Sequence, residues 1–255
     1  MLLPCDDRLE EDCLACLSRG FIDHPSVGIA FGSILRIDDQ GKEIGTNVIV
    51  QHDGALDHRE AIRLIAEKFN PLQHPMVRAK IFSETDRFNP SFASFCDAYL
   101  WLKLLFRGWG AYVVAKPLTA LRCHEDQGQA LFRHQTKDNL KKLGDHYGTT
   151  LSPDFYKKNH LSLQLFRFVQ FFNHNHQSAF GAQSDIENLM IQRLVLTHLS
   201  TLYFSLRHGN FSSSRFEAAL AIQLVKEYGP IYMLKLYCGT VISAFRRVFA
   251  YSSAT

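Results

Sequence analysis

Apolar positions in the first half of the chain follow helical and extended spacing in turn. Residues 9 to 22 have apolar side chains on one helix face after an acidic stretch, and residues 57 to 69 repeat this pattern, so both are predicted helices. Two β-branched runs, at 27 to 37 and 44 to 50, flank a polar stretch at 38 to 42. This arrangement predicts two strands joined by a turn.

The pattern changes after a segment with two prolines, which excludes a continuous helix there. Residues 76 to 81 have strand-like character. Residues 97 to 107 return to helical spacing, which stops at Gly108. Two short buried strands are predicted at 111 to 115 and 118 to 123, so this half of the chain is expected to be mixed α/β.

From residue 127 onward nearly every apolar position follows a helical period. Breaks in this period fall near residues 148–153, 181, 209–214 and 229–230. They predict roughly four helices in the last ~100 residues. We therefore expect an α/β region over residues 1 to 130 and an all-α region over residues 131 to 255.

The composition is that of an ordinary folded protein. Of 255 residues, 46% are hydrophobic and 21% are charged, which excludes disordered, collagen-like and small disulfide-rich chains. The net charge of +3 is too small to indicate nucleic acid as a partner. The charge is uneven, because residues 151 to 255 hold ten Lys and Arg against five Asp and Glu (+5), which leaves 18 against 20 (−2) for residues 1 to 150.

Six cysteines are scattered along a chain that opens without a signal segment, so we expect reduced thiols and a cytoplasmic location. Cys13 and Cys16 form a C-x-x-C pair inside a predicted helix, with no second pair at zinc-site spacing. This favours buried helix positions over a metal or redox site. The two most apolar windows, 189 to 206 and 231 to 251, contain charged or ionisable side chains, so neither is predicted to span a membrane.

The first candidate for chemistry is a pair of adjacent carboxylates, Asp6 and Asp7, between the apolar residues 2 to 4, a predicted strand, and the first predicted helix. Such a pair suits a divalent cation that bridges phosphates, because Mg²⁺ and Mn²⁺ take one or two carboxylates plus substrate oxygens. The alternative is that both aspartates cap the helix that begins at residue 9.

The order of the segments around this pair resembles the second half of a family 2 glycosyltransferase, an inverting enzyme of the GT-A fold. The matching segments are Asp6-Asp7-Arg8-Leu9 for the acidic loop, His24-Pro25-Ser26-Val27-Gly28-Ile29-Ala30-Phe31-Gly32 for the next strand, residues 37–42 for a hairpin, Asn70-Pro71, Asp97-Ala98-Tyr99-Leu100-Trp101-Leu102-Lys103-Leu104 with Gly108, and Leu121-Arg122-Cys123-His124. The resemblance covers about residues 1 to 130.

The resemblance implies a role for each matching residue. Asp6 would ligate Mn²⁺ or Mg²⁺ on the diphosphate of a nucleotide-sugar donor, and Asp7 would support this site or contact the donor. His124 would complete the metal or diphosphate site, and a purely structural histidine is the alternative. Pro4 replaces the first aspartate of the family's loop.

Asp97 matches the family's catalytic base, which removes the proton of the acceptor hydroxyl. A carboxylate at a helix N-terminus is well fixed for this task, and an ordinary helix N-cap is the alternative. Cys96 replaces the glutamate that usually precedes this base. Trp101 is expected in the core, whereas His174 and His176 are expected on a solvated helix end.

The strand and base-binding unit with which the family begins has no counterpart ahead of Met1. The resemblance therefore implies a partial GT-A-type sheet without the N-terminal half that binds the donor's base. Three explanations are open: a longer gene product, a partner chain that supplies this half, or a decayed remnant.

We expect a glycosyltransferase that moves a sugar from a nucleotide-sugar donor to a saccharide or lipid-linked acceptor in surface polysaccharide biosynthesis. The alternatives are an inactive remnant or scaffolding subunit, and a metal-dependent hydrolase that uses Asp6, Asp7 and His124. For the helical region, a subdomain packed on the transferase core is weighed against peripheral contact of Lys235 to Phe249 with the anionic inner face of the membrane.

Overall fold

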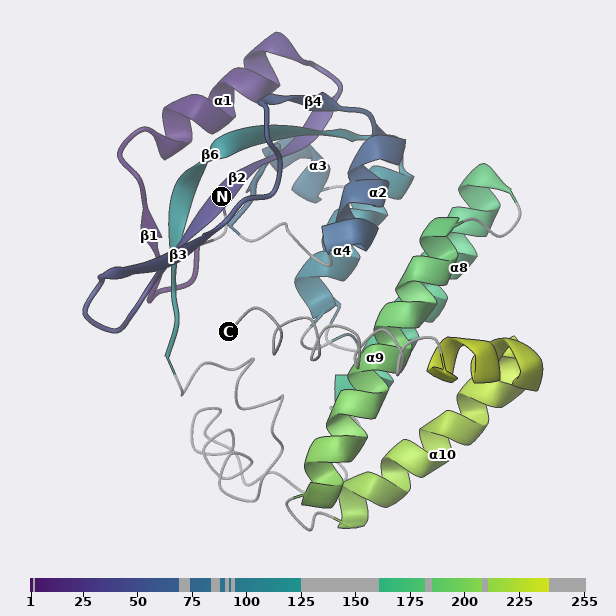
Figure 1. Ribbon diagram of the computed structural model, residues 1–255. Helices are drawn as coiled ribbons and strands as arrows, with labels where there is room; N and C mark the ends of the chain where they lie inside the picture. Colours follow the sequence, from purple (N-terminus) through teal and green to yellow (C-terminus); the bar gives the residue numbers. More distant parts are fainter. Residues whose placement is uncertain are drawn as a thin grey trace. The chain divides into compact units, whose positions relative to one another are not determined.

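The computed structural model describes residues 1, 3–68, 74–83, 88–89, 92, 95–124, 161–181, 185–207 and 211–238 (Figure 1). The chain divides into two compact units. The first holds Met1–Gln127 and Phe171–Ile186, and the second holds Gly128–Gln170 and Glu187–Thr255.

A six-stranded mixed sheet organises the first unit. Its strands are β1 (Arg8–Leu9), β2 (Val27–Ile37), β3 (Glu43–Asn47), β4 (Gly54–Leu56), β5 (Met76–Val77) and β6 (Gly110–Arg122). Their order is β1-β6-β2-β3, with β4 beside β6 and β5 beside β2. β2 and β6 run parallel, and the other pairs are antiparallel. Every residue of β2 except Arg36 is buried, as expected for a central strand covered on both faces.

Helices lie on both sides of this sheet (Figure 1). α1 (Cys13–Asp23) lies on β2 and β6, where Cys13 and Leu17 join a core cluster with Ala30, Val114 and Leu118. α2 (His58–Lys68) and α4 (Cys96–Phe106) pack against each other and approach the sheet from the other side. The short α3 (Ala79–Ser83) follows β5. The α/β class predicted for this region is confirmed.

Close packing explains two glycines of β2, the strand that carries part of the resemblance. A Cβ atom at Gly32 would lie 2.8 Å from Cγ of Leu118, and one at Gly28 would lie 2.8 Å from Cδ1 of Ile81 and 2.9 Å from Cβ of Trp109. Neighbouring side chains therefore already occupy the space that a Cβ atom at either position would need. Gly28 and Gly32 therefore let β2 approach its neighbours closely.

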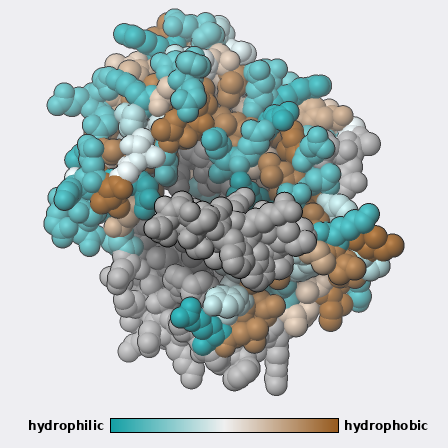
Figure 2. All heavy atoms as spheres, viewed as in Figure 1, coloured by the Kyte–Doolittle hydropathy of each residue, from teal (hydrophilic) through white to brown (hydrophobic). Residues whose placement is uncertain are grey.

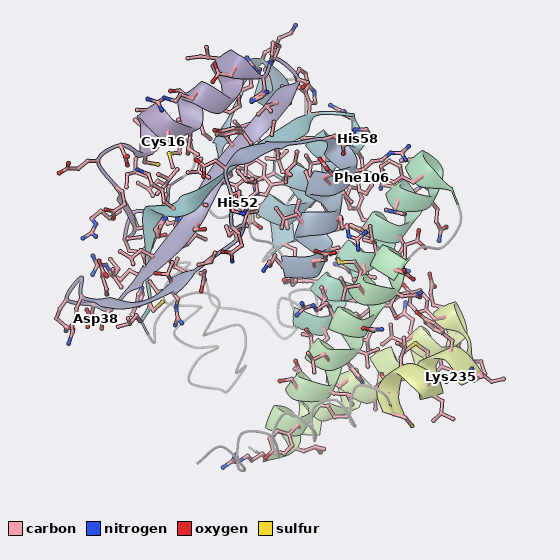
Figure 3. All side chains as sticks on the ribbon, turned by 45° about the horizontal axis from the view of Figure 1, so that its top comes forward. Cys16, Asp38, His52, His58, Phe106 and Lys235 are labelled. Atoms are coloured by element: carbon pink, nitrogen blue, oxygen red, sulfur yellow. The ribbon has the colours of Figure 1, made fainter. Side chains whose placement is uncertain are left out.

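Aromatic side chains connect α8 (Leu161–Phe180) to α2 and α4 within the first unit. The ring centroid of Phe171 lies 4.6 Å from that of Tyr99, and Phe180 stacks on His58 at 5.8 Å. Figure 3 labels His58 on α2 and Phe106 on α4, the latter 6.4 Å from Phe171. Trp101 is 1% exposed, which confirms its predicted place in the core.

His174 is exposed, as predicted, but it lies inside α8 and not at a helix end, and the prediction is wrong for His176. His176 is buried and stacks on Phe172 at a centroid distance of 5.7 Å. The reason is helical spacing: His176 lies four residues after Phe172 and therefore on the same, inward face, whereas His174 points outward.

The described residues of the second unit are helical. This unit contains the first half of α8, α9 (Asp185–Arg207) from Glu187 onward, α10 (Phe211–Tyr228) and a further helical segment at 230–238. Gly229, at a φ of +86°, adopts the left-handed conformation that commonly ends a helix, and Pro230 begins the next one. The predicted breaks at Gly181 and 229–230 are confirmed. Residues 125–160 and the segment 239–249 of the predicted membrane contact lie outside the described residues.

A polar cluster lies inside the apolar core of this unit. Ser162 of α8 donates a hydrogen bond to Oε1 of Glu217 on α10 at 2.8 Å, and the other carboxylate oxygen pairs with Nδ1 of His198 on α9. All three residues are at most 1% exposed. Tyr237 packs edge-on against His198, and burial together with the charge of Glu217 raises the pKa of Tyr237 to about 12. The serine donates to the glutamate and the cluster has almost no exposed surface, so it joins three helices and offers no nucleophile to a substrate.

The structure confirms the predicted hairpin of 27–37 and 44–50, although its second strand ends three residues earlier than predicted. It also confirms the helices predicted at 57–69 and 97–107, whose ends differ by one residue. The predicted helix at 9–22 begins only at Cys13, because residues 8 and 9 pair with β6 instead.

Two predicted strands, at 111–115 and 118–123, are one strand, β6. Pro117 is tolerated inside it because the register with β2 shifts beside its partner Ser33, where the regular ladder is interrupted. Of residues 76–81, only Met76–Val77 is extended, and α3 follows.

We expect Cys13 to resist alkylation in the folded protein, whereas Cys5 and Cys238 react. Cys13 has no exposed surface and burial raises the pKa of its thiol to about 11, while the other two are exposed. Peptide mass spectrometry after brief treatment with iodoacetamide at about pH 8 measures the contrast. Modification of Cys13 at the rate of Cys5 would contradict the packing of α1 on the sheet.

Candidate functional site

The acidic pair lies in a turn that precedes a strand rather than follows one. Residues 3 and 4 belong to no strand, the backbone N–H of Asp7 donates to the carbonyl of Pro4 at 3.3 Å, and β1 begins at Arg8. The turn forms where Pro4, which has no N–H to donate to a ladder, interrupts the apolar residues. The expected strand at residues 2–4 is therefore wrong at the described residues 3 and 4. Helix capping by the pair is also wrong, because Asp12 is the N-cap of α1.

Asp7 is a buried anchor. Its Oδ2 lies 2.6 Å from Nε2 of His74, and its Oδ1 accepts the backbone N–H of Arg122 at 2.8 Å. The side chains of Asp7 and His74 are 1% and 3% exposed. Asp7 therefore fits the supporting role that the resemblance implies, and it offers no exposed oxygen to a donor.

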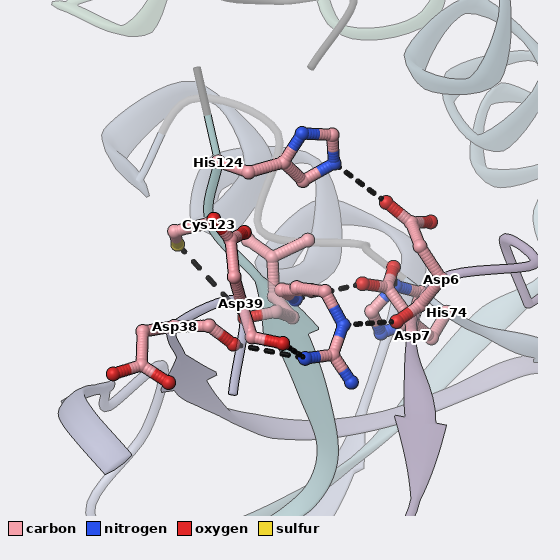
Figure 4. Close-up of polar contacts among 9 residues, drawn as sticks. Asp6, Asp7, Asp38, Asp39, His74, Cys123 and His124 are labelled. Atoms are coloured by element: carbon pink, nitrogen blue, oxygen red, sulfur yellow. Dashed lines mark hydrogen bonds and ion pairs between the residues drawn. The ribbon is translucent and has the colours of Figure 1, made fainter. Parts of the chain in front are cut away.

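Arg122 ties the acidic turn to the turn between β2 and β3 (Figure 4). Its Nε donates to the carbonyl of Asp6 at 3.0 Å, and its Nη1 donates to the carbonyls of Asp38 and Asp39 at 2.9 and 2.7 Å. A guanidinium has several donors in a fixed plane, so one side chain holds both turns. The backbone of Asp6 is thereby fixed at the end of β6.

Asp6 and His124 face each other at the surface (Figure 4). Oδ2 of Asp6 lies 3.1 Å from Nε2 of His124, and the side chains are 37% and 27% exposed. Carboxylate oxygen and imidazole nitrogen are both metal donors, and a cation at a nucleotide site commonly takes one or two protein ligands plus phosphate oxygens. The carboxylate of Asp6 is a donor that Mg²⁺ and Mn²⁺ commonly take, whereas an imidazole such as that of His124 is more typical of Zn²⁺, Cu²⁺, Fe²⁺ and Ni²⁺ sites.

His74 is the site residue that the sequence pattern does not single out. Its φ of +54° is rare for a residue other than glycine, and its buried Nδ1 has no hydrogen-bond partner among the described residues. The available signal was a histidine directly before Pro75, in a segment where prolines exclude a helix. Spacing gives no indication that this histidine meets Asp7, which lies 67 positions earlier.

Asp97 comes from a different element, the first turn of α4. Its Oδ1 accepts the backbone N–H of Ala98 at 2.7 Å, and the residue is half-buried. Phe95 occupies the N-cap, so the simple N-cap alternative is wrong. Burial and the charge of Asp97 raise the pKa of the Cys96 thiol. The structure thus brings Asp6, Asp7 and His124 together near Arg122. Asp97 lies on a separate element, α4.

No model of a known protein family matches this chain, and no curated protein is significantly similar to it. In the part of the chain that the structure describes, no group of three or more His, Cys, Asp or Glu side chains is placed to hold a metal ion. Across these same residues, no helix has both the length and the apolar character needed to cross a bilayer.

Arg122→Ala is expected to lower the free energy of unfolding of the first unit by about 2–4 kcal/mol, because three backbone carbonyls lose a charged donor. The matched control is Arg36→Ala, which removes an exposed arginine from β2 and should change stability by at most about 0.5 kcal/mol. Urea unfolding monitored by tryptophan fluorescence compares the two. Equal losses would show that Arg122 does not hold the turns.

Proposed function

We propose that the chain acts in inverting glycosyl transfer, as a GT-A-type glycosyltransferase that moves a sugar from a nucleotide-sugar donor to a saccharide or lipid-linked acceptor in surface polysaccharide biosynthesis. One observation carries this proposal. Asp6 and His124, which the resemblance assigns to one donor site, lie 118 positions apart in the chain and form a pair at 3.1 Å. An accidental match of two short motifs gives no reason for them to meet.

The sheet is compatible with the proposal. The parallel pair β2 and β6, with helices on both sides, fits a partial GT-A-type sheet. The acidic turn and the end of β6 lie at the same edge, since Arg122 bonds to both Asp6 and Asp7. In open α/β sheets, ligands bind in crevices beyond the carboxyl ends of strands. Arg122 is the last residue of β6, and His124 lies just beyond this end.

Asp6 and His124 would hold Mn²⁺ or Mg²⁺ against the donor diphosphate. When bound, the cation supplies positive charge that stabilises the departing diphosphate. Asp7 and Arg122 keep the acidic turn in place, so that the carboxylate of Asp6 is presented from a fixed backbone.

Asp97 would act as the base of a single displacement. The acceptor oxygen attacks the anomeric carbon, the bond between that carbon and the diphosphate oxygen breaks with its electron pair leaving on the diphosphate, and the configuration inverts. Asp97 takes the proton that the acceptor hydroxyl loses. The positive end of the α4 dipole lies beside this carboxylate in the first turn of the helix.

A second candidate function is a non-catalytic binding or scaffolding subunit. Two departures from the family's pattern favour it: Pro4 stands in place of one acidic residue and Cys96 in place of another. A thiol whose pKa is raised stays neutral at pH 7 and does not replace a carboxylate. The hydrolase alternative is less well supported, because Asp7 is buried and both of its oxygens are engaged.

Turnover separates the two candidates. The purified chain is incubated with Mn²⁺, a panel of nucleoside-diphosphate sugars and a mixture of oligosaccharides, and released nucleoside diphosphate is quantified. The proposal predicts metal-dependent release and a product with inverted anomeric configuration, determined by nuclear magnetic resonance. Absence of release with every donor, also in the presence of proteins that co-purify from the native host, would favour the scaffolding subunit.

A further inference from the structure

Three helical segments of the second unit expose large apolar side chains. Leu206 of α9 is 55% exposed, Ile222 of α10 is 61% exposed, and Ile231 and Leu234 of segment 230–238 are 72% and 66% exposed. Figure 2 shows hydrophobic atoms on the part of the surface that corresponds to the yellow segments of Figure 1. Single exposed apolar residues are common, but a surface helix normally presents mainly polar residues on its outer face.

Loose packing does not explain this exposure. Leu220, Leu224 and Met233 lie on the inner faces of α10 and segment 230–238 and are at most 3% exposed. Tyr232 also donates a hydrogen bond to Oδ1 of Asn188 on α9 at 2.6 Å. These segments therefore have a well-buried inner face and a second, outward apolar face.

Three of the exposed apolar positions have an exposed basic residue next to them in the sequence. The exposed pairs are Leu206-Arg207, Val225-Lys226 and Leu234-Lys235. Figure 3 shows Lys235 on the segment drawn in yellow. Glu227, the acidic residue next to one pair, accepts a hydrogen bond from Gln170. Long basic side chains can extend beside an apolar surface and keep their charge among polar groups, which suits them to a membrane interface.

We infer that the outer surface of α9, α10 and segment 230–238 docks on an anionic lipid membrane. The apolar side chains would enter the boundary between headgroups and acyl chains, and the basic side chains would contact lipid phosphates. Among the described residues 187–238, the exposed charged side chains are three basic ones, Arg207, Lys226 and Lys235, and one acidic one, Glu227. This excess of positive charge favours anionic lipid over a second copy of the chain, which would bring like charges together. The inference is independent of the proposed activity.

Co-sedimentation of the full chain with phosphatidylcholine vesicles, with and without phosphatidylglycerol, tests this inference. We expect half-maximal binding at about tenfold less lipid when phosphatidylglycerol is present, and weaker binding at high salt. The double variant Ile231→Gln with Leu234→Gln should bind anionic vesicles about tenfold more weakly. The double variant Lys226→Gln with Lys235→Gln should lose most of the preference for phosphatidylglycerol.

The matched control replaces apolar residues of the first unit that are comparably exposed. Ile22 and Ile44 are 74% and 48% exposed, and the double variant Ile22→Gln with Ile44→Gln should bind like the wild type. Circular dichroism confirms that each variant folds. The inference is overturned if the wild type is recovered equally with neutral and anionic vesicles, or with neither. It is also overturned if Ile231→Gln with Leu234→Gln and Lys226→Gln with Lys235→Gln both bind anionic vesicles like the wild type. A dimer in sedimentation equilibrium that Ile231→Gln with Leu234→Gln abolishes would assign the surface to a second copy instead.

Discussion

Asp97→Asn lowers the rate of sugar transfer by about 10²- to 10⁴-fold in our account, because an amide cannot accept the proton of the acceptor hydroxyl. The substitution keeps the size of the side chain and an oxygen that can accept the N–H of Ala98, so the first turn of α4 should remain intact. Donor affinity is expected to stay within about twofold, since a base that acts on the acceptor contributes to the transition state rather than to donor binding.

The matched control for this experiment is Asp57→Asn. Asp57 also lies at the start of a helix, where its Oδ1 accepts the N–H groups of Arg59 and Glu60. Asparagine is a good N-cap, so this variant should retain stability and activity. Steady-state release of nucleoside diphosphate, together with donor titration, compares both variants with the wild type. An unchanged rate in Asp97→Asn would refute its assignment as the base.

Glu217→Ala is expected to lower the stability of the helical unit by about 3–5 kcal/mol, the cost of breaking a buried polar pair by removing one partner. Glu217 has no exposed surface, and its carboxylate serves both Ser162 and His198. Without it, two buried polar side chains lose their partner and three helices lose a common contact. The loss should therefore be larger than for an ordinary surface substitution.

A second glutamate on the same helix provides the control. Glu227 is exposed and accepts one hydrogen bond from Gln170, so Glu227→Ala should cost at most about 1 kcal/mol. Urea unfolding by circular dichroism gives the stability, and hydrogen exchange at the amides of α9 and α10 localises the loss. Similar values for the two variants would mean that the buried cluster does not stabilise the unit.

Locally encoded features were predictable from the sequence. The helix at 57–69 was found because its apolar face is regular, and the structure adds a reciprocal capping pair in which Asp57 and Glu60 each accept the other's backbone N–H. The hairpin was found because Asp38 and Gly41 provide turn chemistry, with Asp38 Oδ1 accepting two backbone N–H groups and Gly41 at a φ of +84°.

Features that depend on distant parts of the chain were not predictable in the same way. β1 has only two residues and exists because β6 pairs with it, so its sequence has no strand pattern. The contact between Asp7 and His74 involves a positive φ at His74. The sequence has no glycine beside His74 that would have indicated such a backbone conformation. The pairing of Asp6 with His124 was expected only from the resemblance, because periodicity does not relate residues 118 positions apart.

The central claim, that Asp6 and His124 bind a donor diphosphate through a divalent cation, is tested most directly by calorimetric titration of nucleoside diphosphates in the presence of Mn²⁺. We predict micromolar affinity for at least one nucleotide, about tenfold weaker binding in Asp6→Asn or without metal, and unchanged binding in Asp39→Asn, an exposed aspartate of the adjoining turn. Failure of the wild type to bind any nucleoside diphosphate, or equal affinity in Asp6→Asn, would contradict the claim.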